Sequence, residues 1–186
     1  PGTYVAQLTV DGQRFTEAFA VRRDPRLTDV TDADMVAQFE LADAIRISES
    51  RANGAVILIR DLREQLETSL AGSNNQELRS AASSFAADVS AVEAELYQVR
   101  NQSPKDKIAF PIKLNDRLTG LRSHLERGDG APADAYRAVF EELSSELDAH
   151  LAVLERLLSE RLPQLNRDLA GAGLPRAVVR GPLISD

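Results

Sequence analysis

Few side chains in this 186-residue chain are of a type and spacing that could hold a metal or form a covalent intermediate. Cysteine is absent, which excludes disulfides, thiolate metal sites and a cysteine nucleophile. The two histidines, His124 and His150, each follow a leucine by three positions, so neither completes the Glu-x-x-His motif of di-iron helical bundles. We therefore expect no metal site and no cofactor.

Carboxylates are the commonest candidates for acid–base chemistry. They are dense near the end of the chain, at Glu141, Glu142, Glu146, Asp148, Glu155 and Glu160. Glycoside hydrolysis needs two carboxylates about 5 to 10 Å apart, whereas these fall mostly on the outward faces of the predicted helices. No nucleophile elbow, glycine-rich phosphate loop or zinc-protease motif occurs. A hydrolase stays open as an alternative, and the sequence assigns no catalytic residue.

Residues 101–116, NQSPKDKIAFPIKLND, form the most unusual segment. The chain has 19 arginines and only three lysines, and all three lie here, at Lys105, Lys107 and Lys113. Ile108, Phe110 and Ile112 alternate, which predicts a short extended piece packed by one face. The segment is either a loop across the bundle or a contact site for a partner domain. Lys105, Lys107, Phe110 and Lys113 are its candidate interaction residues.

The beginning of the chain is predicted to be a β-hairpin. Residues 4–10 and 13–21 are rich in strand formers and flank Asp11-Gly12, the preferred pair for a type I′ turn. That turn places Tyr4, Leu8, Val10, Phe15 and Phe19 on one face, with Glu17 as the exception. A lone hairpin is marginal in water, so we expect this face to be covered by the helices or by the strands of an upstream sandwich.

Three aromatic residues of the hairpin, Tyr4, Phe15 and Phe19, are candidate interaction residues. An alternative hypothesis is that these three residues form a carbohydrate-binding face. The absence of tryptophan and an aromatic content of 5 % count against stacking on sugars.

The elements behind the hairpin are predicted to be helices, in keeping with 26 alanines and 24 leucines. Apolar residues recur at helical spacing over residues 32–71, 75–99, 114–125 and 133–170. We expect Thr31 and Asn75 to be N-caps, a kink or close helix contact over residues 48–54, and a kink or break at Pro163. The first stripe includes Phe39, and the second ends at Val99.

The predicted fold is mainly α: an antiparallel bundle of three to four helices, two of them long, preceded by the hairpin. The domain boundaries are 1–26 for the hairpin and 27–186 for the bundle and its C-terminal tail, docked through Leu174, Val178 and Leu183. Because the segments differ in length, we expect a level of the bundle with only two helices. The seam exposed there would need covering by the hairpin, by the loop of residues 101–113 or by another chain.

Charge and hydropathy argue against two kinds of interaction, with nucleic acid and with the interior of a membrane. A net charge of −7 argues against a nucleic-acid surface. No window approaches 18 uninterrupted apolar residues, so we expect no membrane span.

Two stretches resemble known proteins. The first looks like the closing hairpin of an immunoglobulin-like or fibronectin type III-like domain; it covers residues 1–26, PGTYVAQLTVDGQRFTEAFAVRRDPR. The second is similar to the C-terminal region of large bacterial proteins with sortilin-type, BNR-repeat β-propellers, which are often labelled glycosyl hydrolases. It consists of LYQVRNQSPKDKIAFPIKLNDRL, followed by GDGAPADAYRAVFEELSSELDAHL. The resemblance covers nearly all of the chain, and residues 101–115 are its most specific part.

The resemblance implies an exported parent protein, periplasmic or extracellular, whose hydrolase label belongs to the upstream propeller; no catalytic residue carries over to this chain. Since the chain begins with proline rather than methionine, we also expect it to be a piece of something longer. The expected function is that of a non-catalytic C-terminal accessory module, which packs on upstream domains of the same polypeptide, forms a homodimer or binds a partner.

Overall fold

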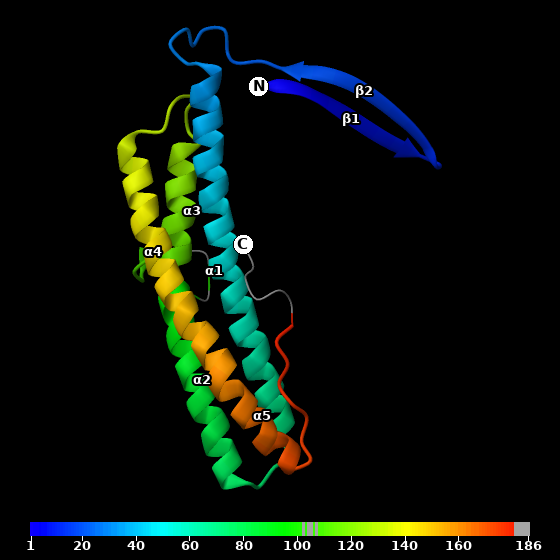
Figure 1. Cartoon of the computed structure of the whole chain (residues 1–186), viewed down its shortest axis with the longest axis vertical. Helices are drawn as coiled ribbons and strands as arrows, with labels where there is room; N and C mark the ends of the chain where they lie inside the picture. Colours follow the sequence, from blue (N-terminus) through cyan, green and yellow to red (C-terminus); the bar gives the residue numbers. More distant parts are fainter. Residues whose placement is uncertain (102, 104–105, 107, 181–186) are drawn as a thin grey trace.

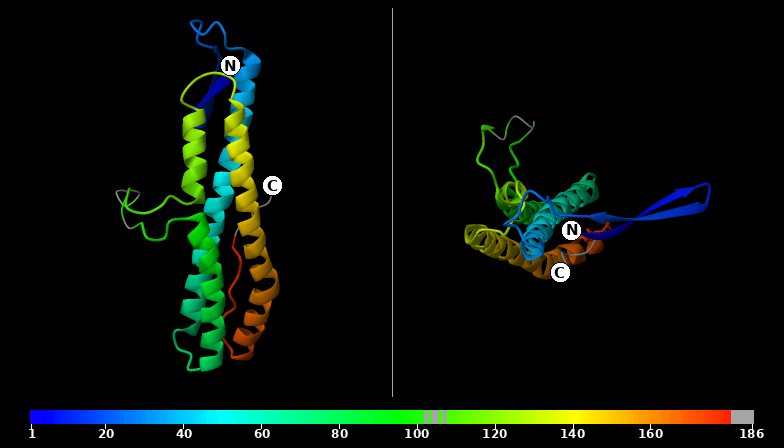
Figure 2. Two further views of the ribbon diagram at one scale, coloured as in Figure 1. Left: turned by 90° about the vertical axis from the view of Figure 1, so that its left-hand side faces the viewer. Right: turned by 90° about the horizontal axis from the view of Figure 1, so that it is seen from above.

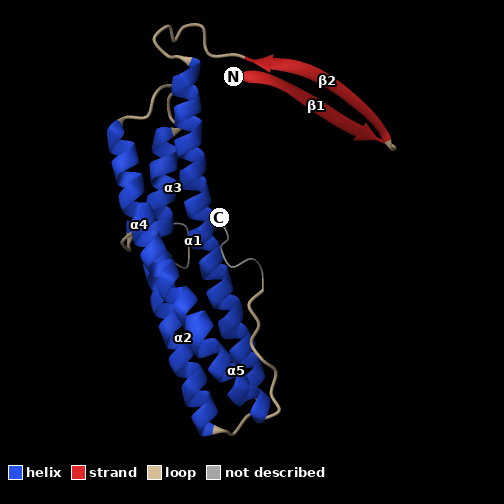
Figure 3. Cartoon of the chain, viewed as in Figure 1, coloured by secondary structure: helices blue, strands red, loops and turns tan. Residues whose placement is uncertain are grey.

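The computed structural model describes residues 1–101, 103, 106 and 108–180 of the chain. Three long helical rods lie side by side, the second antiparallel to the first and third, and a β-hairpin projects from one end (Figure 1). The mainly α fold with a preceding hairpin is thus confirmed. Figure 3 shows that the projecting hairpin consists of strands and that the rods consist of helices.

The first rod is the single helix α1, Asp32–Leu70. Thr31 caps it as predicted: its hydroxyl accepts a hydrogen bond from the Asp34 N–H, and the Asp34 carboxylate accepts one from the Thr31 N–H. The helix does not break at residues 48–54. Instead Ser48 and Ala52 are buried there, as expected for a place where small side chains let neighbouring helices approach.

The second rod consists of α2, Gln76–Leu96, and α3, Leu114–Leu125, placed one after the other along α1 (Figure 1). Asn75 caps α2 as predicted, through a 3.0 Å hydrogen bond from the Leu78 N–H. Because both helices pack on α1, the described residues form three rods rather than the level with only two helices that we expected. The predicted seam is correct up to Leu96 but wrong at Val99, which lies beyond the helix end and is exposed.

The third rod contains α4, Asp134–Arg156, a π-helical turn η2, Leu157–Arg161, and α5, Leu162–Gly171. Pro163 has no N–H to donate to the carbonyl one turn earlier. The rod continues because the π turn changes the hydrogen-bond spacing: the Leu162 N–H donates to the Leu157 carbonyl five residues before it. The irregularity predicted at Pro163 is therefore a π turn rather than a helix end.

The core lies between the three rods and is built from aliphatic side chains around one aromatic ring. Its largest fully buried members include Phe85, Ile45, Ile59, Leu62, Leu96, Leu118, Leu143, Leu147 and Leu169. They come from all three rods, so the leucine ridges are used to pack the helices together.

The tail, residues 174–180, runs back along α1 and α5. The Asn166 side chain forms two 2.8 Å hydrogen bonds with the backbone of Ala177, and Gln65 binds the backbone of Val178 in the same way. Ala177 is buried while the Val178 side chain is exposed. The prediction that Val178 docks the tail was thus wrong; Leu174 does pack against the core, and Leu183 lies outside the described residues.

The hairpin pairs β1, Gly2–Val10, with β2, Gln13–Val21. The register is the predicted one, with Tyr4 opposite Phe19 and Leu8 opposite Phe15. Asp11 and Gly12 have φ values of 49° and 80°, as a type I′ turn requires. Every residue of both strands is exposed, and within the described residues neither strand packs on a helix. The helices therefore do not cover the apolar face.

The loop between α2 and α3 stands away from the bundle (Figure 2). The Gln98 side-chain amide donates a 2.8 Å hydrogen bond to the Pro111 carbonyl, which ties the two ends of the loop together. Ile108 is 94 % exposed and Ile112 is also exposed, and the Ala109 N–H donates to the Asp106 carbonyl in a tight turn. The expected extended piece packed by one face was thus wrong, because two of its three alternating side chains are exposed.

Candidate interaction surface

The predicted aromatic residues of the hairpin do gather on one face. Tyr4 and Phe19 stack across the strands with their ring centroids 5.9 Å apart. Phe15 faces Leu8 four residue pairs further along the hairpin and is 55 % exposed. We call the set Tyr4, Leu8, Val10, Phe15 and Phe19 the hairpin face. All five side chains remain about half exposed, so each still has apolar area to bury.

One acidic residue interrupts the hairpin face. Glu17 pairs with Ala6, and this pair is the middle of the nine that run from Gly2 opposite Val21 to Val10 opposite Gln13. Since paired residues point to the same side of a sheet, the Glu17 carboxylate lies at the centre of the face. None of the residues on that side is lysine or arginine, so the face supplies no cation of its own to Glu17.

A well-bonded corner joins the hairpin to α1. Arg23 forms a 2.6 Å ion pair with Asp32 in the first turn of α1 and also donates to the Val30 carbonyl. Within the corner, Arg26 binds the Asp24 carboxylate at 2.6 Å. This bond and the Arg26 N–H lower the pKa of Asp24, so its carboxylate stays charged. The contacts of Arg23 thus connect the end of β2 to the start of α1.

A second apolar surface lies beside the base of the hairpin. Val36 and Phe39, which we call the α1 wall, are exposed on the first turns of α1, and Phe39 is 70 % exposed. Together with Tyr4 and Met35 they line a hollow of about 410 Å³. The hairpin face and the α1 wall thus meet at Tyr4 and form the two sides of one angle.

The sequence did not predict the α1 wall, because the helical spacing of apolar residues placed Phe39 in the buried stripe. A helix turns by about 100° per residue, so Phe39 lies about 120° around α1 from the fully buried Ile45. Counting that angle, rather than steps of three and four residues, is the signal that could have identified Phe39 as exposed.

Among the described residues, the segment 101–116 with its three lysines forms no common site with the hairpin. Lys113 is ion-paired with Glu95 at 3.0 Å, and the Phe110 ring lies under the Arg100 guanidinium, 5.5 Å from it. Lys105 and Lys107 lie outside the described residues. Seen from above, the loop and the hairpin project from different sides of the bundle (Figure 2).

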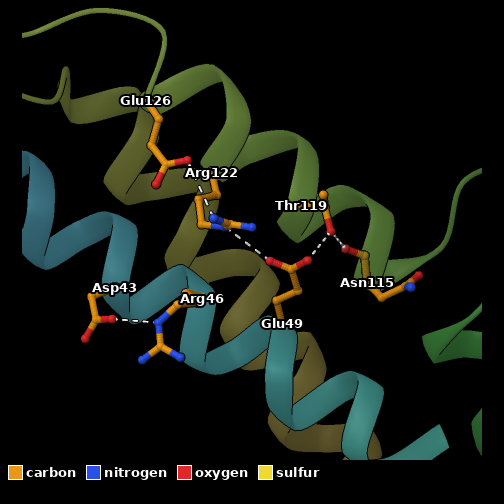
Figure 4. Close-up of polar contacts among 7 residues, drawn as sticks. All are labelled: Asp43, Arg46, Glu49, Asn115, Thr119, Arg122 and Glu126. Atoms are coloured by element: carbon orange, nitrogen blue, oxygen red, sulfur yellow. Dashed lines mark hydrogen bonds and ion pairs between the residues drawn. The ribbon is translucent and has the colours of Figure 1, made fainter. Parts of the chain in front are cut away.

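Polar side chains between the rods serve to hold them together. Figure 4 shows Glu49 of α1 accepting hydrogen bonds from Thr119 at 2.7 Å and from Arg122 at 3.2 Å, both on α3. Glu93 of α2 is buried and binds two arginines of α1, Arg60 at 2.6 Å and Arg63 at 3.2 Å. In both places a carboxylate is neutralised by arginine across two helices.

One carboxylate beside a smaller hollow is also ion-paired. Asp148 binds Arg51 at 2.8 Å beside a hollow of about 240 Å³ between α1 and α4. Among the described residues, no three His, Cys, Asp or Glu side chains gather as a metal site would need. Nor does any helix in the described ranges have the length and apolarity to span a membrane.

Comparison of the chain with protein-family models, curated proteins and solved structures found no match.

Proposed function

We propose that this chain is a non-catalytic accessory module of a longer, exported polypeptide, and that its hairpin face docks on a β-rich domain of that same polypeptide. One observation carries the proposal. The hairpin is formed in full register, yet its aromatic face is covered by nothing in the described chain.

The energetics of the hairpin support a partner. Fully burying a large apolar side chain contributes about 1.5–3 kcal/mol. The five residues of the hairpin face are half exposed, so covering them would contribute on the order of 5 kcal/mol before the costs of association. A two-stranded hairpin without a third strand or a helix on it is marginal, and a partner supplies that missing stabilisation.

The strand edges point to the kind of partner. Both outer edges of the hairpin carry backbone N–H and C=O groups that no other strand pairs. A β-sheet with an apolar face can bury the aromatic side chains and pair an edge at the same time. The likeness of residues 1–26 to the closing hairpin of a sandwich, and of residues 101–115 to the end of β-propeller proteins, supports an upstream domain of the same exported chain as that partner.

Photocrosslinking from Phe15 tests the proposal. A benzoylphenylalanine placed at position 15 of the full-length gene product is expected to crosslink to a β-rich segment upstream of this chain, identified by mass spectrometry. The matched control carries the same group at Val153, an exposed residue of α4, and is expected not to reach that segment. Crosslinks from position 15 to the helices of this chain alone, or none at all, would overturn the proposal.

A further inference from the structure

The hairpin face is continuous with the α1 wall. Tyr4 belongs to the first and Phe39 to the second, and both line the same hollow of about 410 Å³. A body that covers the hairpin face near Tyr4 therefore meets Phe39 as well. The exposed apolar surface available to a partner is larger than the hairpin alone, since it includes both sides of the angle.

Exposed polar contacts join the two sides of the angle. The Arg23–Asp32 ion pair and the bond from Arg23 to the Val30 carbonyl connect the end of β2 to the start of α1. The Thr31–Asp34 capping box fixes that start. A partner thus finds the two apolar sides already oriented, which lowers the entropy lost on binding.

The position of Glu17 disfavours a second copy of the chain stacked face to face on the hairpin face. A two-fold axis through the middle of the hairpin face would bring two Glu17 carboxylates together, because the Ala6–Glu17 pair is central. No lysine or arginine of the face offsets this repulsion, and like charges juxtaposed in an interface cost several kcal/mol. A partner that carries a cation at this point has no such penalty.

We infer that one partner fills the angle, covering the hairpin face and the α1 wall together, and that it presents a lysine or arginine to Glu17. This rests on the proposed function and adds two features to it: α1 takes part in the interface, and the β-rich partner surface is apolar with a cation opposite Glu17.

Thiol labelling tests the first feature, because the chain has no cysteine of its own. Single variants Phe15→Cys, Phe39→Cys and Val153→Cys are made in the isolated chain and in the full-length gene product. Maleimide labelling of each position is then followed by mass spectrometry of the labelled peptide. We expect the rate at positions 15 and 39 to fall at least tenfold in the full-length protein, while position 153 is unchanged.

The outcomes separate the two proposals. Protection of position 15 with no protection of position 39 would overturn the inference and leave the proposed function standing. Unchanged rates at both positions would overturn both. A light-scattering mass of two chains for the isolated module, with position 39 already protected in it, would identify a second copy as the occupant and contradict the inference.

Charge variants at Glu17 test the second feature in the full-length Phe15→Cys protein. Glu17→Lys is expected to return the labelling rate at position 15 at least halfway to that of the isolated chain, because it places two cations together. Glu17→Gln, which removes the charge and keeps the shape, is expected to have a smaller effect. If Glu17→Lys leaves the protection intact, the partner has no cation at this point.

Discussion

Two phenylalanine truncations in the same chain measure directly how the hairpin relates to the bundle. Phe85 of α2 is 1 % exposed and sits in the core between the rods, whereas Phe15 is 55 % exposed and its strand touches only the other strand. Replacing a buried phenylalanine by alanine costs about 3–5 kcal/mol, from lost burial and the cavity left behind. Replacing an exposed residue away from the core changes stability by less than about 0.5 kcal/mol.

The assay is urea unfolding followed by circular dichroism at the helix minimum, which reports on the bundle. With a denaturant slope of about 1–3 kcal/mol per molar urea, Phe85→Ala is expected to lower the midpoint by on the order of 2 M. Phe15→Ala is expected to leave the midpoint within about 0.3 M of the wild type. A loss of bundle stability in Phe15→Ala comparable to that in Phe85→Ala would refute the reasoning, since the hairpin face would then be part of the bundle core.

Two further substitutions probe the polar contacts. Glu93→Ala removes the acceptor of two arginines, Arg60 and Arg63, and is expected to lower the free energy of unfolding by about 1.5–3 kcal/mol, the value of charged hydrogen bonds. The denaturant must be urea rather than guanidinium, because salt screens ion pairs. An unchanged urea midpoint would show that the ion pairs of Glu93 contribute nothing to stability. For Asp34, bonds from the Thr31 N–H and hydroxyl lower the pKa below its ordinary value, so its contribution is present at neutral pH and is lost as the pH falls through that lowered pKa. Thermal unfolding of the wild type and Asp34→Asn is therefore expected to differ at neutral pH and to converge in acid, and a gap that persists in acid would contradict the capping assignment.

The helices could be predicted because their information is local. The steps of three and four residues from Leu78 to Leu96 specify one buried seam, and the capping residues Thr31 and Asn75 mark where helices begin. The pattern failed where a tertiary contact decides the outcome. Val99 continues the heptad spacing, yet α2 ends at Leu96, and Gln98 closes the loop onto Pro111 instead.

The hairpin illustrates the same division. Asp11-Gly12 determines the turn, and the turn determines which side chains share a face, so the hairpin face could be predicted residue by residue. What lies beside that face depends on the corner at Arg23 and on the angle of Phe39 around α1. Neither follows from strand patterning, and the α1 wall was therefore missed.

Amide hydrogen exchange of the hairpin tests the central claim most directly. It compares the amides of β1 and β2 in the isolated chain with the same amides in the longer polypeptide that we propose, using α2 as the internal reference. The account predicts fast exchange in the isolated chain, where both strand edges are open, and protection at least a hundredfold greater in the full-length protein, with α2 unchanged. Hairpin exchange that is equally fast in both proteins would contradict it.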